Sequence, residues 1–324
     1  MKIDWESQAS HILFNPRLPQ NIQESLKHQA TLPGTLYIAT SGTTALPKLV
    51  VLSKHAFLVS AAAVNHQLDS SEQDIWHSPL PLFHVGGLSI LARAHLSGAA
   101  VIPWNLPKWS HTNYLEQLKR GVTLSSLVPT QLYDLIQANA SPPPSLRTLF
   151  IGGDALSESL FKQAQALGWP VTPTYGLTEC ASQVAVGNPL QPLRHVTLNV
   201  IDGILQIKSD ALLTGYLDAD GTFQDPKIDG WFRTEDRAAL HPNHIHLHGR
   251  NRDWVQIGAE TVHIPKLQTH LEALFGPIGH IVPHKDPRLG VTLYLHLKDS
   301  LSAKTFVEQF NKTVLPFERL RGQA

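Results

Sequence analysis

The sequence predicts an α/β fold with a doubly wound, mostly parallel sheet, a small β subdomain and a small α+β module at the C-terminal end. Three observations lead to this prediction. Strand-like and helix-like segments alternate over residues 35–185, as they do in parallel sheets with crossover helices. From about Leu193 the chain changes to short strands and turns, and beyond Arg250 it mixes helices with strands. We therefore expect two domains, residues 1–250 and residues 251–324.

Composition favours a globular protein of the cytoplasm. Lysine plus arginine and aspartate plus glutamate number 26 each among 324 residues, so no strong field favours nucleic acid or an anionic membrane. The apolar runs are interrupted well before membrane-spanning length, and the N-terminal residues lack the apolar core of a signal peptide. The single cysteine, Cys180, fits a reducing compartment. Composition alone says no more than a cytosolic α/β protein.

The elements of the predicted sheet follow one another along the chain. Thr35–Ala39 is an apolar segment typical of a buried strand, and residues 53–70 show helical spacing with Ser53 as the N-cap. Residues 74–78 lead into an apolar loop that carries His84. The other elements expected in this part are helices near 88–97, 111–120, 129–136 and from 157, and strands at 99–103, 123–128 and 149–154.

The second half of the chain is expected to form smaller elements. Short strands are predicted at residues 204–207 and 245–248, with a turn at Asp220-Gly221 between them. Beyond Arg250 the pattern favours strands at 255–257 and 291–295 and helices near 265–275 and 302–312. This order is typical of a β subdomain followed by a compact α+β module.

A run of small hydroxyl residues follows the first strand and is the most informative stretch of the chain. Its candidate anion-binding residues are Thr40, Ser41, Gly42, Thr43, Thr44 and Lys48. Short hydroxyls and backbone N–H groups can surround a phosphate, and the lysine adds a positive charge. The run follows a buried strand, where open α/β sheets place their ligands. It does not match GxxxxGK(S/T), and taken alone it could equally be a Ser/Thr-rich turn.

Three further segments follow this run in order. Thr174–Glu179 resembles the YGxTE signature of the adenylate-forming superfamily, which includes acyl-CoA synthetases and firefly luciferase. Gly230–Asp236 resembles its GWxxTGD motif, and Gly249–Asp253 resembles its GRxDD hinge. Thr40–Lys48 is then similar to the phosphate loop of the superfamily, (S/T)SGTTGxPK. The resemblance covers nearly the whole chain.

The resemblance implies how the phosphates of ATP are held. Adenylation joins a carboxylate to the α-phosphate and expels pyrophosphate, so negative charge builds on phosphate oxygens. Lys48 and the loop hydroxyls would follow that charge, Thr178 would donate to the α-phosphate, and Glu179 would be the Mg²⁺ ligand. Taken alone, Glu179 has the alternative role of a solvated carboxylate at the start of a helix.

The resemblance also implies a site for adenosine. Tyr175 has a flat face suited to the adenine ring, and Gly152 and Gly153 let the backbone approach the base closely. Asp236 can accept hydrogen bonds from the ribose hydroxyls, with Arg250 beside it. The alternative for Asp236 alone is an ordinary turn residue.

Two segments narrow the resemblance. Residues 81–90, PLFHVGGLSI, and residues 175–184, YGLTECASQV, are similar to the o-succinylbenzoate–CoA ligases of menaquinone biosynthesis. This similarity implies an ATP-dependent acid–CoA ligase that forms an acyl-adenylate and then a thioester, with ATP, CoA and a carboxylic acid as substrates and Mg²⁺ as cofactor. His84 would line the acid pocket, and its alternative role is to fill the core of its loop.

Two other functions stay open from the sequence. One is a degenerate adenine-nucleotide-binding protein with impaired adenylation, and the other is an adenylating enzyme that loads a carrier protein. The absence of the C-terminal PxxxxGK lysine favours the degenerate protein, whereas retained Glu179, Asp236 and Arg250 and the similarity of residues 175–184 favour the ligase. The chain also departs from the superfamily where Ala45 and Leu49 replace loop glycines and Glu235 replaces the glycine before Asp236.

The two ends of the chain also depart from the superfamily. The phosphate loop begins at residue 40, so we expect residues 1–250 to be an adenylate-forming domain shortened at its N-terminus. No PxxxxGK motif follows Leu315, so we expect residues 251–324 to be a truncated lid domain. The missing lysine predicts that adenylation is weaker than thioester formation from a supplied acyl-adenylate.

A cluster of histidines raises the question of a metal site. Its members are His241, His244, His246 and His248. Side chains two residues apart on a strand share a face, which would place the last three together. No nearby cysteine or carboxylate pair completes a tetrahedral set, so surface histidines are the favoured interpretation.

Overall fold

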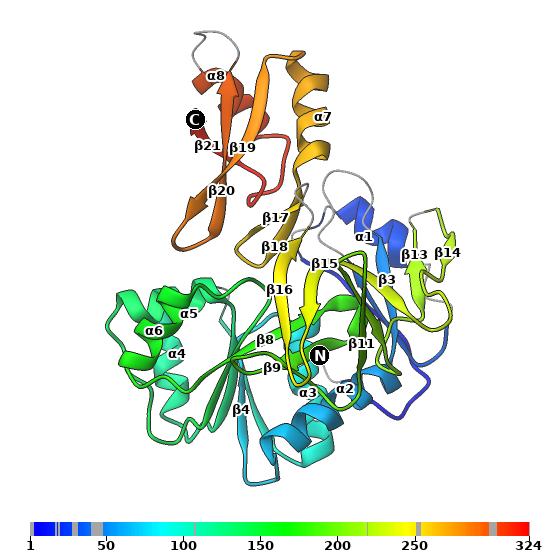
Figure 1. The fold of residues 1–324 in the computed structure, drawn as a ribbon, viewed down its shortest axis with the longest axis vertical. Coiled ribbons are helices and arrows are strands. Elements are labelled where there is room, and N and C mark those ends of the chain that lie inside the picture. The colour runs from blue at the N-terminus through cyan, green and yellow to red at the C-terminus, as the bar shows by residue number, and fades with distance from the viewer. Residues whose placement is uncertain are drawn as a thin grey trace. The chain divides into compact units, whose positions relative to one another are not determined.

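A computed structural model describes residues 3–16, 18, 20–27, 32–39, 48–106, 108–218, 220–250, 254–297 and 303–323. Its described residues form two compact units, one ending at Gly249 and one beginning at Arg250 (Figure 1). The first unit carries most of the predicted site residues. The role of the second unit as a lid stays a prediction.

A seven-stranded sheet forms the centre of the first unit. Its strands, in spatial order, are β10 (Gln191–Pro192), β9 (Ser182–Val186), β8 (Val171–Leu177), β7 (Thr148–Ile151), β6 (Leu124–Leu127), β4 (Ile75–Ser78) and β5 (Ala100–Pro103). The five strands from β8 to β5 run parallel, whereas β9 and β10 are antiparallel to their neighbours. The mostly parallel sheet expected from the strand–helix alternation is present.

Helices cover both faces of this sheet, as a doubly wound fold requires (Figure 1). The side chain of Phe150 on β7 packs with α2 (Lys54–Leu68) and α3 (Val85–Ser97). Its neighbours Leu149 and Ile151 point to the other face, because successive strand side chains alternate. That face is covered by α4 (His111–Leu118), α5 (Pro129–Gln137) and α6 (Glu158–Ala166). Within the described ranges, none of the helices has the length and apolar character needed to cross a membrane.

A second, five-stranded sheet corrects the prediction for the first strand. Its order is β1 (His11–Leu13), β2 (Thr35–Ala39), β3 (Leu49–Ser53), β13 (Gly215–Leu217) and β14 (Phe223–Gln224). We expected residues 35–39 in the parallel sheet, but β2 pairs antiparallel with β3 in this separate sheet. The reason is a second apolar run, Leu49–Leu52, which is fully buried and pairs with the first.

Helices α2 and α3 fix the two sheets relative to each other within this unit. Ser53 caps α2 as predicted, since its hydroxyl accepts a hydrogen bond from the Ala56 N–H at 3.0 Å. Phe57 of α2 and Leu88 of α3 pack with the five-stranded sheet, whereas Val64 and Ile90 pack with the seven-stranded sheet. The helix pair is therefore buried on two sides. The short helix α1 (Gln20–Lys27) precedes β2.

The short strands expected after Leu193 form a four-stranded sheet in the first unit. Its order is β11 (Thr197–Ile201), β12 (Ile204–Lys208), β15 (Phe232–Leu240) and β16 (Ile245–Arg250). Inward side chains such as Leu205, Ile207 and Phe232 join the core formed by α2 and α3. This packing anchors β15, the strand that carries Asp236.

The second unit is an α+β module with its own core. It contains the pair β17 (Trp254–Ile257) and β18 (Glu260–His263), the sheet of β19 (Gly279–Asp286), β20 (Gly290–Leu297) and β21 (Leu320–Gln323), and the helices α7 (Ile264–Phe275) and α8 (Ala303–Phe310). Buried Leu271, Leu293 and Phe310 come from three of these elements and pack together. Both predicted helices are present.

An ion pair between exposed Arg147 and buried Asp74 ties the amino ends of three parallel strands. Arg147 donates from Nε and Nη2 to the two carboxylate oxygens of Asp74, at 2.9 and 2.8 Å, and Thr123 donates to the same carboxylate at 2.7 Å. Arg147 Nη1 also reaches the Leu68 carbonyl at the end of α2. Burial acts to raise the pKa of Asp74, but hydrogen bonds from Arg147, the Ser71 N–H and Thr123 outweigh it and lower the pKa to about 2.

Replacing this carboxylate should lower stability in a pH-dependent way. Asp74→Asn is expected to reduce the free energy of unfolding at pH 7 by roughly 1–2 kcal/mol, because one pKa unit corresponds to about 1.4 kcal/mol and solvent around exposed Arg147 screens part of this gain. The native pKa lies below the unfolded value of 3.8, so the stabilisation is present above that value and is lost as pH falls toward 2. Urea denaturation across this range measures the difference. Asp69→Asn, at an exposed helix end, is the control, and an Asp74→Asn deficit that stays constant down to pH 2 would contradict this account.

Candidate active site

The candidate site begins where β8 ends. Thr178 and Glu179 lie in a single helical turn, Thr178–Cys180, that connects β8 to β9. The two strands come so close at Gly176 that a Cβ there would collide with the Ser182 carbonyl. Only glycine allows this approach, which explains its place between Tyr175 and the predicted catalytic pair.

One hydrogen bond joins the predicted adenine and ribose residues. The Tyr175 hydroxyl donates to Asp236 Oδ2 at 2.6 Å, across 61 residues of sequence. The Asp236 N–H donates to the Thr234 hydroxyl at 3.1 Å, and that hydroxyl donates to the buried Leu205 carbonyl at 2.8 Å. The Asp236 carboxylate is thus held against Tyr175 by its own strand.

A second group of contacts joins Glu179 to Lys48 through Tyr216. The Tyr216 hydroxyl donates to Glu179 Oε1 at 2.8 Å. The Lys48 Nζ atom lies 4.1 Å from the centroid of the Tyr216 ring and 3.6 Å from Asp218 Oδ1. Lys48 directly precedes β3, which pairs with the β13 strand that carries Tyr216. Sequence reasoning did not identify Tyr216, because no motif marks it.

The electrostatic environment keeps Tyr216 and Cys180 protonated. The pKa of Tyr216 lies far above its ordinary value, chiefly because the hydroxyl is buried. The charge and hydrogen bond of Glu179 and the charge of Glu235 raise this pKa further. Burial and the nearby Glu179 raise the pKa of Cys180 to about 12. Tyr216 therefore acts as a hydrogen-bond donor, and the Cys180 thiol is not a nucleophile.

The paired glycines at the end of β7 have packing reasons of their own. A Cβ on Gly152 would collide with the Thr174 hydroxyl of β8, and Gly153 adopts a φ of +84°. The first glycine lets β7 and β8 pack closely, and the second forms a left-handed turn. Their predicted approach to the adenine base stays a prediction.

His84 lies at the start of α3, where the apolar loop turns into the helix. Its backbone is extended, and its carbonyl accepts hydrogen bonds from the N–H groups of Gly87 and Leu88, both at 3.1 Å. A Cβ on Gly87 would collide with the Pro81 carbonyl, so the glycine lets the loop fold onto the helix. The His84 ring lies 4.6 Å from that of Phe83. Its role beside an acid substrate stays a prediction.

Some predicted site residues lie outside the described residues. These are Thr40, Ser41, Gly42, Thr43 and Thr44 of the phosphate loop, the hinge residues 251–253 and the side chain of Arg250. The strands on either side of the phosphate loop are antiparallel neighbours, with Ala39 opposite Leu49. The expectation that the loop follows a strand of the parallel sheet was therefore wrong.

The histidine cluster forms two pairs of rings rather than one group. His241 and His244 stack at 4.3 Å between centroids at the turn from β15 to β16, and His246 and His248 lie 4.8 Å apart on β16. Across the described ranges, no three or more His, Cys, Asp or Glu side chains are placed to share a metal ion. Glu179 stays the candidate metal ligand.

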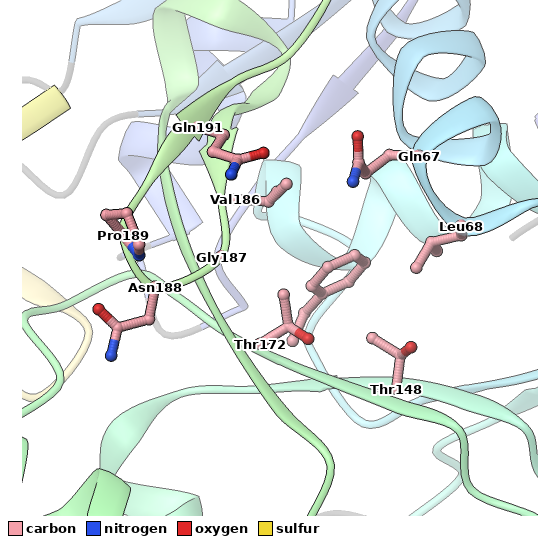
Figure 2. Close-up of a pocket in the computed structure, with 10 residues that line it drawn as sticks. Gln67, Leu68, Thr148, Thr172, Val186, Gly187, Asn188, Pro189 and Gln191 are labelled. Carbon is pink, nitrogen blue, oxygen red and sulfur yellow. The ribbon is translucent and has the colours of Figure 1, made fainter. Parts of the chain in front are cut away.

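A cavity of about 280 Å³ lies at the opposite ends of β7 and β8. Figure 2 shows Gln67, Thr148, Thr172 and Gln191 around it. Thr148 and Thr172 stand at the amino ends of their strands, whereas Gly152 and Tyr175 stand at the carboxyl ends. The cavity is lined by none of the predicted site residues.

Comparison with known proteins identifies the class. The family model described as AMP-binding enzyme matches residues 22–205, more than half of the chain, and the chain belongs to this family. Curated relatives include a 2-succinylbenzoate–CoA ligase of Bacillus cereus, 28% identical over 80% of this chain, and that of Bacillus cytotoxicus, 28% identical over 71%. The chain spans 58% and 53% of these relatives. The resemblance inferred from the motifs is confirmed.

Solved structures agree on the fold. An o-succinylbenzoate CoA synthetase variant from Bacillus subtilis, bound to the product analogue OSB-NCoA, superposes with a TM-score of 0.76 at 25% identity. The match covers 88% of this chain and 64% of that one. MenE from E. coli, with a bound analogue of OSB-AMS, superposes with a TM-score of 0.64 at 26% identity. This match covers 95% of this chain and 76% of the E. coli chain. The chain thus has the fold of an adenylate-forming enzyme.

The close approach of β8 and β9 supplies a direct test. Gly176→Ala is expected to lower the free energy of unfolding by about 3 kcal/mol, because an added Cβ must push two backbone segments apart. Gly322→Ala is the control, since a Cβ there meets no atom closer than 3.9 Å. Urea denaturation compares the two variants, and equal stabilities would show that the approach at Gly176 is not tight.

Proposed function

We propose that this chain is an ATP-dependent acid–CoA ligase of the cytoplasm that acts on o-succinylbenzoate. The observation that carries the proposal is the 2.6 Å hydrogen bond between Tyr175 and Asp236, which joins the segments assigned to adenine and ribose. The similarity to 2-succinylbenzoate–CoA ligases supports the choice of acid. The single thiol, buried Cys180, fits a reducing compartment.

Adenosine binding follows from the residues at this hydrogen bond. Tyr175 offers its ring to adenine, and its hydroxyl orients the Asp236 carboxylate toward the ribose hydroxyls. Gly152 and Gly153, at the end of the neighbouring strand, bring backbone rather than side chains to the base.

The first half-reaction forms the acyl-adenylate. A carboxylate oxygen of the acid bonds to the α-phosphorus of ATP, and the bond to the pyrophosphate oxygen breaks. Thr178 donates a hydrogen bond to the α-phosphate, and the Lys48 ammonium stabilises charge on the departing phosphates. These groups lower the barrier by stabilising the charge that develops during transfer.

The residues present fit a magnesium ion. Glu179 supplies a carboxylate in the same helical turn as Thr178, and Mg²⁺ in nucleotide sites is held by one or two carboxylates together with phosphate oxygens. When bound, Mg²⁺ neutralises negative charge on the phosphates. Glu179 would hold it, and Tyr216 donates to one oxygen of that carboxylate.

The second half-reaction transfers the acyl group to CoA. The CoA sulfur bonds to the acyl carbon, the bond from that carbon to the phosphate oxygen breaks, AMP leaves, and the thiol proton passes to solvent. His84, at the start of α3, is proposed to line the acid pocket. The OSB-NCoA complex of the Bacillus subtilis enzyme and the OSB-AMS analogue in the E. coli enzyme support both halves by similarity.

The metal ligand provides the test of this function. Wild type incubated with ATP, Mg²⁺, o-succinylbenzoate and CoA is expected to yield AMP, pyrophosphate and the thioester, detected by mass spectrometry. Glu179→Gln should lower turnover at least 100-fold, because it removes a charged group that acts at the reacting phosphates. Its affinity for AMP, measured by calorimetry, should stay within about twofold. Glu116→Gln, at an exposed position of α4, is the control.

The products distinguish the competing functions. Nucleotide binding without AMP formation by wild type would contradict the ligase and favour a degenerate binding protein. If the acyl group of the adenylate passes only to a carrier-protein thiol, the acceptor is a carrier protein and not CoA. Full turnover by Glu179→Gln would show that Glu179 is not the metal ligand.

A further inference from the structure

Tyr216 contacts two of the predicted catalytic residues at once. Its hydroxyl donates to Glu179 Oε1 at 2.8 Å, across 37 residues of sequence. The face of its ring lies under the Lys48 ammonium, 4.1 Å from the ring centroid, which is a favourable cation–π distance. One side chain thus links the candidate metal ligand to the candidate phosphate-binding lysine.

The backbone around Tyr216 is held on both sides. β13 lies between β3 and β14 in the five-stranded sheet. Tyr216 is opposite Val50 of β3 on one side and opposite Gln224 of β14 on the other. A Cβ on the preceding Gly215 would collide with the Phe223 ring, so the two strands pack closely there. Tyr216 therefore projects from a fixed strand rather than from a loop.

The backbone of Glu179 is tied to the same segment. The Leu213 N–H donates to the Glu179 carbonyl at 2.7 Å, so main chain and side chain of Glu179 are both held by residues 213–216. A carboxylate that accepts a hydrogen bond from a fixed hydroxyl keeps one rotamer, which lowers the entropy lost when it binds a cation. The neighbouring Glu235 and Asp218 add negative charge around Lys48 and Tyr216.

We propose that Tyr216 is a positioning residue: its hydroxyl orients Glu179 for Mg²⁺, and its ring orients Lys48 for the triphosphate. This inference rests on the proposed function. The two roles can be separated, because Tyr216→Phe removes only the hydroxyl, whereas Tyr216→Leu removes the hydroxyl and the aromatic face.

Nucleotide binding measured by calorimetry tests the two roles without turnover. Tyr216→Phe is expected to raise the Mg²⁺ concentration for half-maximal ATP binding about tenfold, the effect of losing a hydrogen bond to a charged group. Its affinity for AMP without Mg²⁺ should match wild type. Tyr216→Leu should in addition weaken ATP binding without Mg²⁺ about threefold, through Lys48. Tyr133→Phe, on α5, is the control.

A double variant shows whether Tyr216 acts through Glu179. If it does, Tyr216→Phe should have no further effect on Mg²⁺ dependence when Glu179 is already glutamine. Additive effects, or a Tyr216→Phe variant within twofold of wild type, would overturn the inference while leaving the ligase function in place. Wild type that binds no ATP with Mg²⁺ would overturn the proposed function and the inference together.

Discussion

The close approach of β8 and β9 at Gly176 is the constraint on which the candidate site depends. It turns the chain back sharply, so that Tyr175 and Glu179 stand on either side of the same strand end. Tyr175 reaches Asp236 of the four-stranded sheet, and Glu179 meets Tyr216 of the five-stranded sheet. A single strand end of the seven-stranded sheet is thus hydrogen-bonded to both other sheets of the first unit. Tyr175, Asp236 and Tyr216 project from regular strands, and Glu179 lies in the short helical turn directly after β8, so the geometry is held largely by the scaffold.

Packing of α2 and α3 keeps these sheets in place. The two helices bury apolar side chains on opposite sides, with Phe57 and Leu88 toward one sheet and Val64 and Ile90 toward the other. Protein cores are close-packed, so a shift of either sheet would have to repack both helix faces. The backbone positions of Lys48, just before β3, and of Glu179, just after β8, therefore follow from the core.

Much of this arrangement could be predicted from the sequence, and the rest depends on long-range pairing. Strand and helix periodicity predicted the parallel sheet, and the order of four motifs predicted the family. Local pattern could not place residues 35–39, because a strand buried on both faces looks the same in either sheet until its partner, Leu49–Leu52, is known. Tyr216 was missed since its function comes from a contact across 37 residues. Gly152 was expected to admit a nucleotide, yet the fold also needs it for packing against Thr174.

The most direct measurement is a crystal structure of residues 1–324 with AMP. Adenine is expected against the Tyr175 ring and both ribose hydroxyls within hydrogen-bond distance of Asp236, with the hydrogen bond from Tyr175 to Asp236 retained. AMP bound elsewhere, for example in the cavity lined by Thr148 and Gln191, would contradict this expectation. So would a nucleotide at the β8 end whose ribose does not contact Asp236, because that hydrogen-bonded pair is the reason for placing adenosine there.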